Sequence, residues 1–403
     1  MEHAMRTAVI GGGAAGFFAA VNLKEMMPEM QVDIFEGGRR VLAKVAVSGG
    51  GRCNCTNSFA SVKDLSQVYP RGHRLLKRLF NVFDHEDAYA WIERRGVPLV
   101  TQEDECVFPR SQDAHSIINL FLSEARRLGV SVYTERRIAS LDELSDYDYV
   151  VVATGGCPRK EGLQWLVDVG QAVVNPCPSL FTFNIDDAGL RALMGTVVET
   201  ATAQLAGTKF KAAGPLLVTH WGVSGPAILK LSSHAARWLA EHDYHAQLSV
   251  NWLSMNDEAL RQELDQMKAV HAQKLMPNVR PLNLSSRLWN HLLEKASLTG
   301  MRWGELGGKS MNRLVNVLAN DTYTVSGRGI HKDEFVTCGG VALEGVNPVT
   351  LESRVRPGLY FAGEVLDIDG VTGGFNFQAA WTTGFVVATA IQAEGRGRPE
   401  ADG

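Results

Sequence analysis

The sequence predicts an α/β protein built on a doubly wound, Rossmann-like parallel sheet that is interrupted by a large inserted domain. Near the N-terminus, a short apolar run ends in glycines and leads into a helical pattern. A second pattern of strand, glycines and helix lies close to the C-terminus. Between these two regions the residue pattern changes, which indicates an inserted domain rather than a continuous sheet.

Composition allows this organisation and bears on the expected partners. The chain has 403 residues, of which 45% are hydrophobic and 21% charged, so it is long enough for two or three globular domains. The formal net charge is −4, which offers no electrostatic reason to expect a nucleic acid or an anionic membrane as partner. We therefore expect neither.

Neither a signal peptide nor a membrane-spanning run is visible, so the expected location is the cytoplasm. The six cysteines suit a reducing compartment because they form no paired framework. One residue separates Cys53 from Cys55. We interpret this pair as small residues in a tight loop rather than as a redox-active dithiol.

The first strand–helix–strand unit is predicted from local pattern. Thr7–Ile10 is an apolar strand, Ala14–Met27 has helical periodicity closed by Pro28, and Gln31–Phe35 is a second strand. Further along, the region 65–100 is predicted to be mainly helical. It is followed by a helix at His115–Leu128 and by strands at Val130–Tyr133 and Tyr147–Ala153.

The inserted domain is predicted to span residues 183–334, so that residues 1–182 and 335–403 form one discontinuous nucleotide-binding domain. We expect a β-rich part at 183–255 and about 320–334, and a helical part at 256–319. The expected elements are strands at Val197–Leu205 and Pro215–Thr219 and helices at Asp257–Lys274, Ser285–Ala296 and Lys309–Ala319.

The first motif is Gly11-x-Gly13-x-x-Gly16, placed directly after a strand and opening a helix. Its glycines permit a tight turn, close approach of a pyrophosphate, and close packing of helix on strand. The first helical residues, Ala14 and Ala15, add free N–H groups at the positive end of the helix.

Glu36 ends the second strand, twenty residues past Gly16, where an acid accepts hydrogen bonds from ribose hydroxyls. Arg39 and Arg40 follow and could favour a 2′-phosphate, but a carboxylate at position 36 repels one.

A second motif follows about a dozen residues later. It reads Ser48-Gly49-Gly50-Gly51-Arg52-Cys53-Asn54, a loop that can wrap an anion or a polar ring. Lys44 lies just before it and can pair with phosphate or with Glu36. Flanking apolar residues argue against a free linker, so we expect this loop to run along a cofactor.

Two more motifs complete the fingerprint. A strand ends at Ala153-Thr154-Gly155, and near the C-terminus a strand ends at Gly363-Glu364. The helix after Gly373-Gly374-Phe375-Asn376 would place its positive end near the flavin edge that gains charge on reduction. An ADP-binding N-terminus combined with this C-terminal pattern predicts FAD as the cofactor.

These segments together resemble the YhiN/BaiN-like family of bacterial flavoproteins, which is also labelled NAD(P)/FAD-dependent oxidoreductase or aminoacetone oxidase family. The resemblance covers almost the whole chain. It implies an FAD-binding domain interrupted by a β-barrel-like domain and a helical domain. Some members resemble reductases of steroid-like enones, but the family implies no single substrate. The matching segments are Gly11–Gly16, Leu42–Asn57, Thr219–Ala227, Val336–Val341, Ala362–Asp367 and Gly373–Gln378.

Other chemistries find less support in the residues. No second Gly-x-Gly-x-x-Gly lies between residues 150 and 330, so NAD(P)H is expected at most as a transient electron donor. His242-x-x-His245 has only Asp243 beside it and is interpreted as a surface pair, so no metal site is expected.

Three functions stay open. The first is a flavin oxidoreductase that acts on a small or hydrophobic organic substrate by hydride transfer through flavin N5. The second is an FAD-dependent RNA-modifying protein, and the third is a non-catalytic FAD-binding module. The sequence does not indicate the oligomeric state.

His220 is the candidate acid/base, because imidazole exchanges protons near neutral pH, with Lys44 as a second candidate. It precedes Trp221 and an expected helix that is capped by Ser224, has Pro226 in its first turn and runs to about Ala240. The alternative is that His220 satisfies a backbone group at a strand end.

Overall fold

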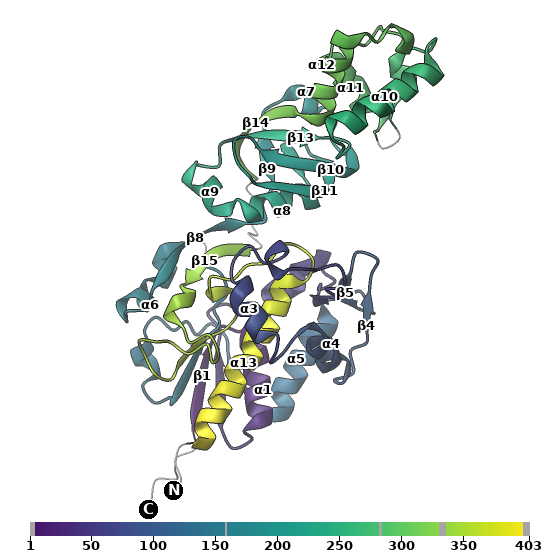
Figure 1. Ribbon diagram of the computed structural model, residues 1–403. Helices are drawn as coiled ribbons and strands as arrows, with labels where there is room; N and C mark the ends of the chain where they lie inside the picture. Colours follow the sequence, from purple (N-terminus) through teal and green to yellow (C-terminus); the bar gives the residue numbers. More distant parts are fainter. Residues whose placement is uncertain (1–4, 158, 282–283, 330–335, 398–403) are drawn as a thin grey trace, which may run out of the picture. The chain divides into compact units, whose positions relative to one another are not determined.

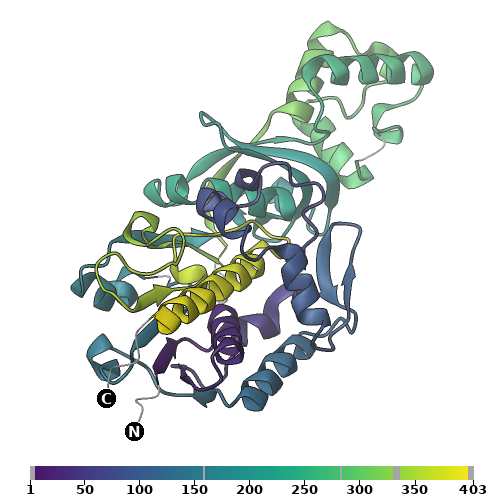
Figure 2. The ribbon, with the colours of Figure 1, turned by 60° about the horizontal axis from the view of Figure 1, so that its bottom comes forward.

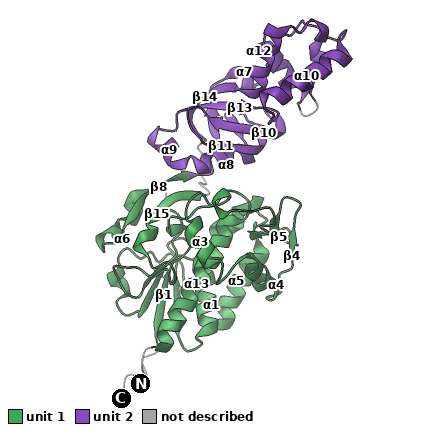
Figure 3. Ribbon diagram, viewed as in Figure 1, with its two compact units in different colours: residues 1–178, 335–403 green, residues 179–334 purple. Residues whose placement is uncertain are grey.

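The computed structural model describes residues 5–157, 159–281, 284–329 and 336–397. The chain divides into two compact units (Figure 3). Unit 1 comprises residues 1–178 and 335–403, and unit 2 comprises residues 179–334. Unit 1 is a Rossmann-type α/β domain and unit 2 contains a closed barrel and helices, which confirms the predicted fold class.

Unit 1 is built on a five-stranded parallel sheet with the strand order β16-β7-β1-β2-β6. The central strand β1 is almost fully buried, as expected for the middle of a parallel sheet covered on both faces. Its partner β2 is paired along its whole length, Arg6 opposite Gln31 and Ile10 opposite Phe35. The strands are β1 (Arg6–Ile10), β2 (Gln31–Phe35), β6 (Ser131–Tyr133), β7 (Tyr149–Val152) and β16 (Leu359–Phe361).

The long helix α13 (Phe375–Gly397) lies against α1 (Ala14–Met26), so the two ends of the chain share one layer (Figures 1 and 2). The approach is close, because a Cβ on Gly384 of α13 would lie 2.9 Å from the carbonyl oxygen of Ala15. Next to this contact, the ring of Phe18 on α1 packs against the rings of Trp91 and Trp381. The other helices of unit 1 are α2 (Ala43–Val47), α3 (His73–Leu79), α4 (His85–Glu93), α5 (His115–Leu128) and α6 (Gln164–Asp168).

Two small sheets and several 3₁₀ turns complete unit 1. One sheet has the order β3-β5-β4, and the other pairs β15 with β8, the strands next to the two connections with unit 2. The elements are β3 (Thr56–Asn57), β4 (Leu99–Thr101), β5 (Cys106–Pro109), β8 (Val173–Ser179), β15 (Val336–Val341), and the 3₁₀ turns η1 (Ser48–Gly50), η2 (Leu65–Gln67), η3 (Leu141–Leu144), η4 (Lys160–Leu163), η7 (Leu343–Gly345) and η8 (Gly363–Val365).

Unit 2 contains a closed antiparallel barrel with the order β10-β11-β12-β9-β14-β13. Closure removes the unpaired edges that an open sheet would expose. The barrel strands are β9 (Phe183–Ile185), β10 (Val197–Leu205), β11 (Lys211–Val218), β12 (Gly222–Ser224), β13 (Ala246–Asn251) and β14 (Asp321–Arg328). The helices are α7 (Ala188–Arg191), α8 (Pro226–His234), α9 (Ala236–Glu241), α10 (Asp257–His271), α11 (Ser286–Lys295), α12 (Gly308–Ala319) and the turns η5 (Met276–Asn278) and η6 (Trp303–Glu305).

Most elements with a strong local signal lie where the sequence predicts them. The helix His115–Leu128 has the predicted bounds, whereas the helix expected at Asp257–Lys274 ends at His271. The region 65–100, expected to be mainly helical, also contains the start of strand β4. Across the described ranges, no helix is both long and apolar enough to cross a membrane, and no group of three or more His, Cys, Asp or Glu side chains could hold a metal ion.

Candidate cofactor site

The turn between β1 and α1 is packed against the protein on one side and open on the other. Gly11 has a φ of 111°, and a Cβ there would lie 2.3 Å from the carbonyl oxygen of Ala153. A Cβ on Gly16 would lie 2.0 Å from the carbonyl oxygen of Gly11. At Gly13, in contrast, a Cβ would meet no protein atom within 4 Å. Gly11 and Gly16 are therefore needed for folding, whereas the space beside Gly13 is available to a ligand.

The N-terminus of α1 faces this open side without a side-chain cap. Gly13 is the N-cap residue and forms no side-chain hydrogen bond, and the first turn contains no acidic residue. Ala14 and Ala15 have no polar side-chain atoms. The first N–H groups of a 13-residue helix are thus left to an outside acceptor, and the helix dipole favours an anion there.

Glu36 lies beside the same turn at the end of β2. Its Oε2 accepts from the N–H of Gly12 (2.9 Å) and its Oε1 accepts from the N–H of Gly38 (2.6 Å). A carboxylate has about four acceptor positions, so these two bonds orient the group and leave acceptor positions for ribose hydroxyls.

The loop Ser48–Asn54 has a backbone that side chains rarely permit. Gly49, Gly50 and Gly51 have φ values of 56°, 69° and 84°, and a Cβ on Gly50 would meet no protein atom within 4 Å. Arg52 braces the loop, since its Nε donates to the carbonyl of Gly49 (3.0 Å) and its guanidinium lies over the ring of Phe108. The loop is therefore held in shape and not a free linker.

Four hydrogen bonds join residues 54–57 to residues 373–381, more than 300 positions apart in sequence. With the Asn54 amide oriented so that its oxygen faces the C-terminal glycines, the bonds run from Gly374 N to Asn54 Oδ1 (3.1 Å), Asn57 Nδ2 to Gly373 O (3.1 Å), Thr56 Oγ1 to Gln378 Oε1 (2.6 Å) and Trp381 Nε1 to Cys55 O (2.8 Å). The glycine loop and the C-terminal pattern therefore form one surface.

Phe375 and Asn376 stabilise the turn that begins α13. The Asn376 side chain both accepts from the N–H of Gly370 (2.8 Å) and donates to its carbonyl (2.9 Å), which closes the turn. Phe375 is buried, and its carbonyl accepts from the hydroxyl of Tyr69 (2.8 Å). In this structure both residues shape the site rather than present free polar groups.

Lys44 forms an ion pair with Glu364 across the site, with 2.7 Å between Nζ and Oε2. The other carboxylate oxygen of Glu364 accepts from the N–H of Thr337 (2.8 Å). The suggested pairing of Lys44 with Glu36 is therefore wrong for this structure, because the Glu36 oxygens accept from backbone N–H groups instead. The sequence alone could not show that Glu364 lies nearer to Lys44 than Glu36 does.

The ends of β7 and β16 complete the site. Ala153 follows β7 and bonds to the carbonyl of Ile10, after which Thr154 is exposed and Gly155 takes a φ of 76°. Gly363 lies against α1, where a Cβ would be 2.6 Å from the Cβ of Ala15. All the motif residues expected to bind the cofactor thus come from the ends and turns of unit 1.

Arg71 is a neighbour of the site that the sequence did not suggest. Its guanidinium forms an ion pair with Asp369, a fully buried carboxylate just before the C-terminal glycine pair. The two residues are 298 positions apart, and no local pattern marks either one. A buried charge pair that fixes this turn is the kind of contact only the folded chain reveals.

The cysteines near the loop are buried. The Sγ atoms of Cys53 and Cys55 are 3.8 Å apart, and burial raises the pKa of the Cys55 thiol well above its usual value. Burial also raises the pKa of Cys106 to about 11. Because the thiolate is the reactive form, these features favour packing over redox chemistry.

In unit 2, His220 lies in the turn between β11 and β12. Its ring is exposed, packs edge-on against Trp221, and has no hydrogen bond to a described residue. The expected Ser224 cap is wrong. Gly225, at φ 93°, is the N-cap, Ser224 ends β12, and Pro226 starts α8. A Cβ at position 225 would lie 2.7 Å from a backbone oxygen, so close packing selects glycine. The expected helix also breaks, with α8 ending at His234.

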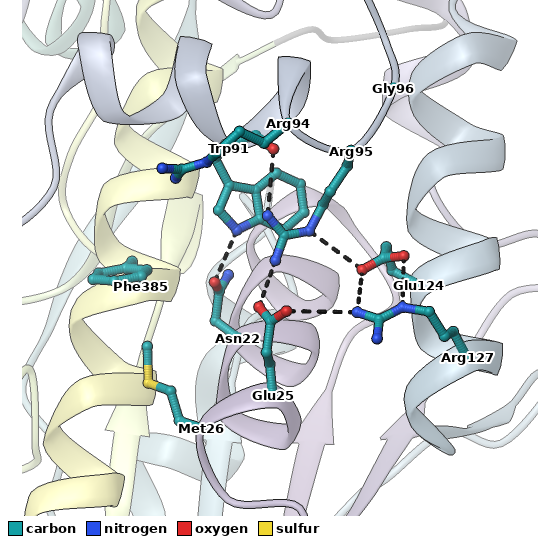
Figure 4. Close-up of a pocket in the computed structure, with 10 residues that line it drawn as sticks. All are labelled: Asn22, Glu25, Met26, Trp91, Arg94, Arg95, Gly96, Glu124, Arg127 and Phe385. Atoms are coloured by element: carbon teal, nitrogen blue, oxygen red, sulfur yellow. Dashed lines mark hydrogen bonds and ion pairs between the residues drawn. The ribbon is translucent and has the colours of Figure 1, made fainter.

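An open groove of about 820 Å³ lies elsewhere in unit 1 (Figure 4). It is lined by the last turns of α1, including Asn22 and Glu25, and by parts of α4, α5 and α13. The glycine turn lies at the opposite end of α1, so this groove is separate from the candidate cofactor site. Its charges are already paired, since Arg95 contacts both Glu25 and Glu124 and Arg127 contacts Glu124.

Comparisons with known proteins agree with the motifs. Residues 5–390 match a family model described as the HI0933-like protein Rossmann domain, which confirms the resemblance seen in the sequence. The ribosomal RNA dihydrouridine synthase of Haemophilus influenzae is 26% identical over 418 residues, covering 98% of this chain and 100% of the relative. The 3-dehydro-bile acid delta(4,6)-reductase of Clostridium scindens is 26% identical over 412 residues, covering 96% and 98%.

A solved structure with a similar outline is the 3-ketosteroid delta1-dehydrogenase from Sterolibacterium denitrificans. It is 13% identical, the match covers 96% of this chain and 99% of that chain, and the TM-score is 0.48. A likeness of this degree carries no argument about substrate or mechanism.

Proposed function

The chain belongs to the HI0933-like Rossmann family, and on this basis we propose that it is an FAD-dependent oxidoreductase that reduces a carbon–carbon double bond conjugated to a carbonyl group. The observation that carries the cofactor part of the proposal is the uncapped N-terminus of α1, with open space at Gly13 and the oriented carboxylate of Glu36 beside it. A pyrophosphate followed by a ribose matches this pair of features.

We propose that FAD binds along this site. The first turn of α1 would bind the pyrophosphate and Glu36 the adenosine ribose. The remaining contacts would come from Lys44, the loop Ser48–Asn54, Ala153, Thr154, Gly155, Gly363, Glu364, Gly373, Gly374, Phe375 and Asn376. When bound, FAD supplies hydride transfer at its N5 position.

The reaction class follows from what two relatives are named for. One is a delta(4,6)-reductase of a 3-dehydro-bile acid and the other makes dihydrouridine in ribosomal RNA. Both names denote the reduction of a carbon–carbon double bond. We propose for this chain the same reaction on a double bond conjugated to a carbonyl, with one hydrogen added as hydride and the other as a proton. A small or hydrophobic enone is the first candidate substrate, with NAD(P)H as the transient donor that restores the reduced cofactor.

His220 is proposed to deliver the proton, because imidazole is the side chain that most often acts as a general acid. Its exposed ring and lack of a hydrogen-bond partner among the described residues leave both nitrogens available. In a His220→Ala variant with unchanged FAD content, the cofactor should still be reduced by NAD(P)H, but its reoxidation by the enone should slow. An unchanged reoxidation rate would assign His220 a structural role.

The second candidate substrate is a uracil base in RNA. Two relatives named ribosomal RNA dihydrouridine synthase, from Haemophilus influenzae and Escherichia coli, each 26% identical, favour it. Uracil has the same arrangement of double bond and carbonyl, so the chemistry is shared and only the substrate's size and charge differ.

Anaerobic stopped-flow reduction of the purified protein with NADH and NADPH tests the central claim. We expect yellow protein whose heat-released cofactor migrates as FAD and whose absorbance near 450 nm bleaches with one of the two donors. The bleached protein should then recover its colour on mixing with a steroid-like enone or with unmodified ribosomal RNA. A colourless protein that cannot be reconstituted with FAD would contradict the proposal, and FAD that no donor reduces would indicate a non-catalytic binding module.

A further inference from the structure

The helical part of unit 2 carries an excess of positive charge that the whole-chain composition hides. Residues 256–319 contain nine Lys or Arg and six Asp or Glu, whereas the full chain has 40 Lys and Arg against 44 Asp and Glu. Four of those six acids lie at positions 257–265, within α10, so residues 266–320 contain eight Lys or Arg and two Asp or Glu. Charge separated in this way produces a local positive potential on a protein that is acidic as a whole.

Four of these basic side chains, Lys274, Arg302, Lys309 and Arg313, are exposed. Within the described part of the chain, none of the four forms an ion pair with a carboxylate. The ion pair that this segment does form joins Lys295 to Asp321. The charges of the four residues are therefore not neutralised by the protein.

The arginines are nevertheless held by neutral acceptors. A guanidinium nitrogen of Arg302 donates to the carbonyl of Gln273, and Arg313 donates to the hydroxyl of Ser310 (3.3 Å). Glu305, three residues from Arg302, uses its carboxylate to accept from the backbone N–H of Arg302 (3.0 Å). Neutral acceptors fix the side chains without cancelling their charge, which suits contact with an external anion.

Backbone contacts bring the segments that carry these residues close together. Arg302 pairs with Leu275 in a short antiparallel bridge, and the N–H of Trp303 donates to the carbonyl of Lys274 (3.0 Å). The ammonium of Lys268 donates to the carbonyl of Leu306 (2.8 Å), two residues before α12 begins. Lys309 and Arg313 follow in the first turns of that helix. We call Lys274, Arg302, Lys309 and Arg313 the cationic patch.

The arginines of unit 1 behave differently. Arg95 and Arg127 line an open groove, but both are paired with Glu25 and Glu124 (Figure 4). Their charges are used inside the protein and leave little net potential. Exposure and the lack of an ion pair do not by themselves distinguish the cationic patch, because Lys63 and Arg126 of unit 1 are also exposed and form no ion pair within the described residues. What distinguishes the patch is the local excess of basic over acidic residues in its segment.

We propose that the cationic patch binds the phosphate backbone of a structured RNA, so that the helical part of unit 2 is the RNA-docking surface of this protein. The proposal rests on the second candidate substrate named above, a uracil base in RNA. Phosphate contacts of this kind fix position and register, and they leave base recognition to other groups. RNA binding at this patch departs from the expectation, drawn from the net charge of the whole chain, that the protein binds no nucleic acid.

The test measures binding of fluorescein-labelled transcripts of the large and small ribosomal RNAs to the full-length protein by anisotropy, across a series of salt concentrations. Lys274→Glu, Arg302→Glu, Lys309→Glu and Arg313→Glu combined should weaken binding at least about tenfold. The slope of log affinity against log salt should fall by roughly 0.7–0.9 for each phosphate that the variant no longer neutralises. A variant with Gln at the same four positions should show a smaller weakening in the same direction.

A matched control carries the same charge change on unit 1, with Lys63, Lys77, Arg126 and Lys160, all exposed, replaced by Glu. It should bind RNA within about threefold of the parent, because it keeps the patch while changing the net charge equally. Thermal melting and FAD content show that each variant is folded.

Three outcomes would overturn the proposal: equal weakening of binding in both variants, which indicates only net charge; binding of the parent to phosphatidylglycerol vesicles but not to RNA; or no binding of the parent to RNA at all. Binding is measured without reductant. A protein that reduces enones yet binds no RNA therefore refutes the docking surface alone, and a protein that binds RNA but holds no FAD refutes the proposed function alone.

Discussion

Two carboxylates in different units of this protein use their oxygens in opposite ways. Glu36, in unit 1, accepts from two backbone N–H groups and is only partly buried. Asp321, in unit 2, is 3% exposed and accepts from the indole of Trp252, the hydroxyl of Tyr323 and the ammonium of Lys295. Glu36 keeps acceptor positions for a ligand, whereas Asp321 is committed to the protein.

The kind of donor separates a binding carboxylate from a structural one. Backbone N–H donors orient Glu36 without neutralising it, so its charge stays available at the surface. Asp321 joins β14 to α11 and to the residue after β13, and its charge is matched by Lys295. Burial and the nearby carboxylate raise the pKa of Tyr323 well above its usual value, so the tyrosine stays a donor.

The largest effect is expected on FAD binding at the site beside Glu36. Gly13→Leu should abolish FAD binding, because a side chain would occupy the open space beside the α1 N-terminus. The apoprotein should lose no more than about 1 kcal/mol of stability, since the site is an extended N-cap with no protein atom near the Cβ. Absorbance at 450 nm and thermal melting measure the two effects.

Gly16→Leu is the control for that prediction. A Cβ at position 16 would lie 2.0 Å from a backbone oxygen, so this variant should fail to fold rather than only lose its cofactor. Retention of FAD by the Gly13 variant would show that the space is not used by the ligand.

The next effect concerns the structural carboxylate. Asp321→Ala would leave an ammonium, a hydroxyl and an indole N–H without their acceptor, and should lower the free energy of unfolding by about 3–5 kcal/mol. FAD content should not change. Urea unfolding checks this, with Asp186→Ala as control, because Asp186 forms an exposed ion pair with Arg191 that is worth at most about 1 kcal/mol. Equal stability of the two variants would contradict the structural role of Asp321.

Glu36→Ala should weaken FAD binding by about 1.5–3 kcal/mol through loss of charge-assisted hydrogen bonds to the ribose. Equilibrium titration of the apoprotein with FAD measures the change. Glu135→Ala removes an exposed carboxylate that pairs with Arg39 and should leave FAD affinity within about twofold. If Glu36→Ala and Glu135→Ala weaken FAD binding equally, Glu36 contributes to binding only through the net charge of the protein.

The smallest effect is expected at Lys44. Lys44→Met removes the exposed ion pair with Glu364 and should change apoprotein stability by less than about 1 kcal/mol. If Lys44 also contacts the pyrophosphate, FAD should dissociate faster from this variant than from Lys44→Arg, which keeps a positive charge at the same position. Equal dissociation rates would limit Lys44 to the ion pair.

The features that could be predicted from the sequence are local. The strand at Gln31–Phe35, the helix His115–Leu128 and the glycine turn between β1 and α1 are found with the predicted character, because periodicity and glycine spacing act over a few residues. The family could be recognised for the same reason, since its motifs are short and contiguous. The roles proposed for those motif residues in binding FAD remain predictions.

Which distant residues meet could be seen only in the folded chain. The bond between Asn57 and Gly373, the pairing of Lys44 with Glu364 and the cluster around Asp321 each join segments far apart in sequence. Even Gly225 caps α8 in place of Ser224 because another strand's backbone lies too close for a side chain. Such contacts depend on how elements pack after they form, and packing leaves no periodic signal in the chain.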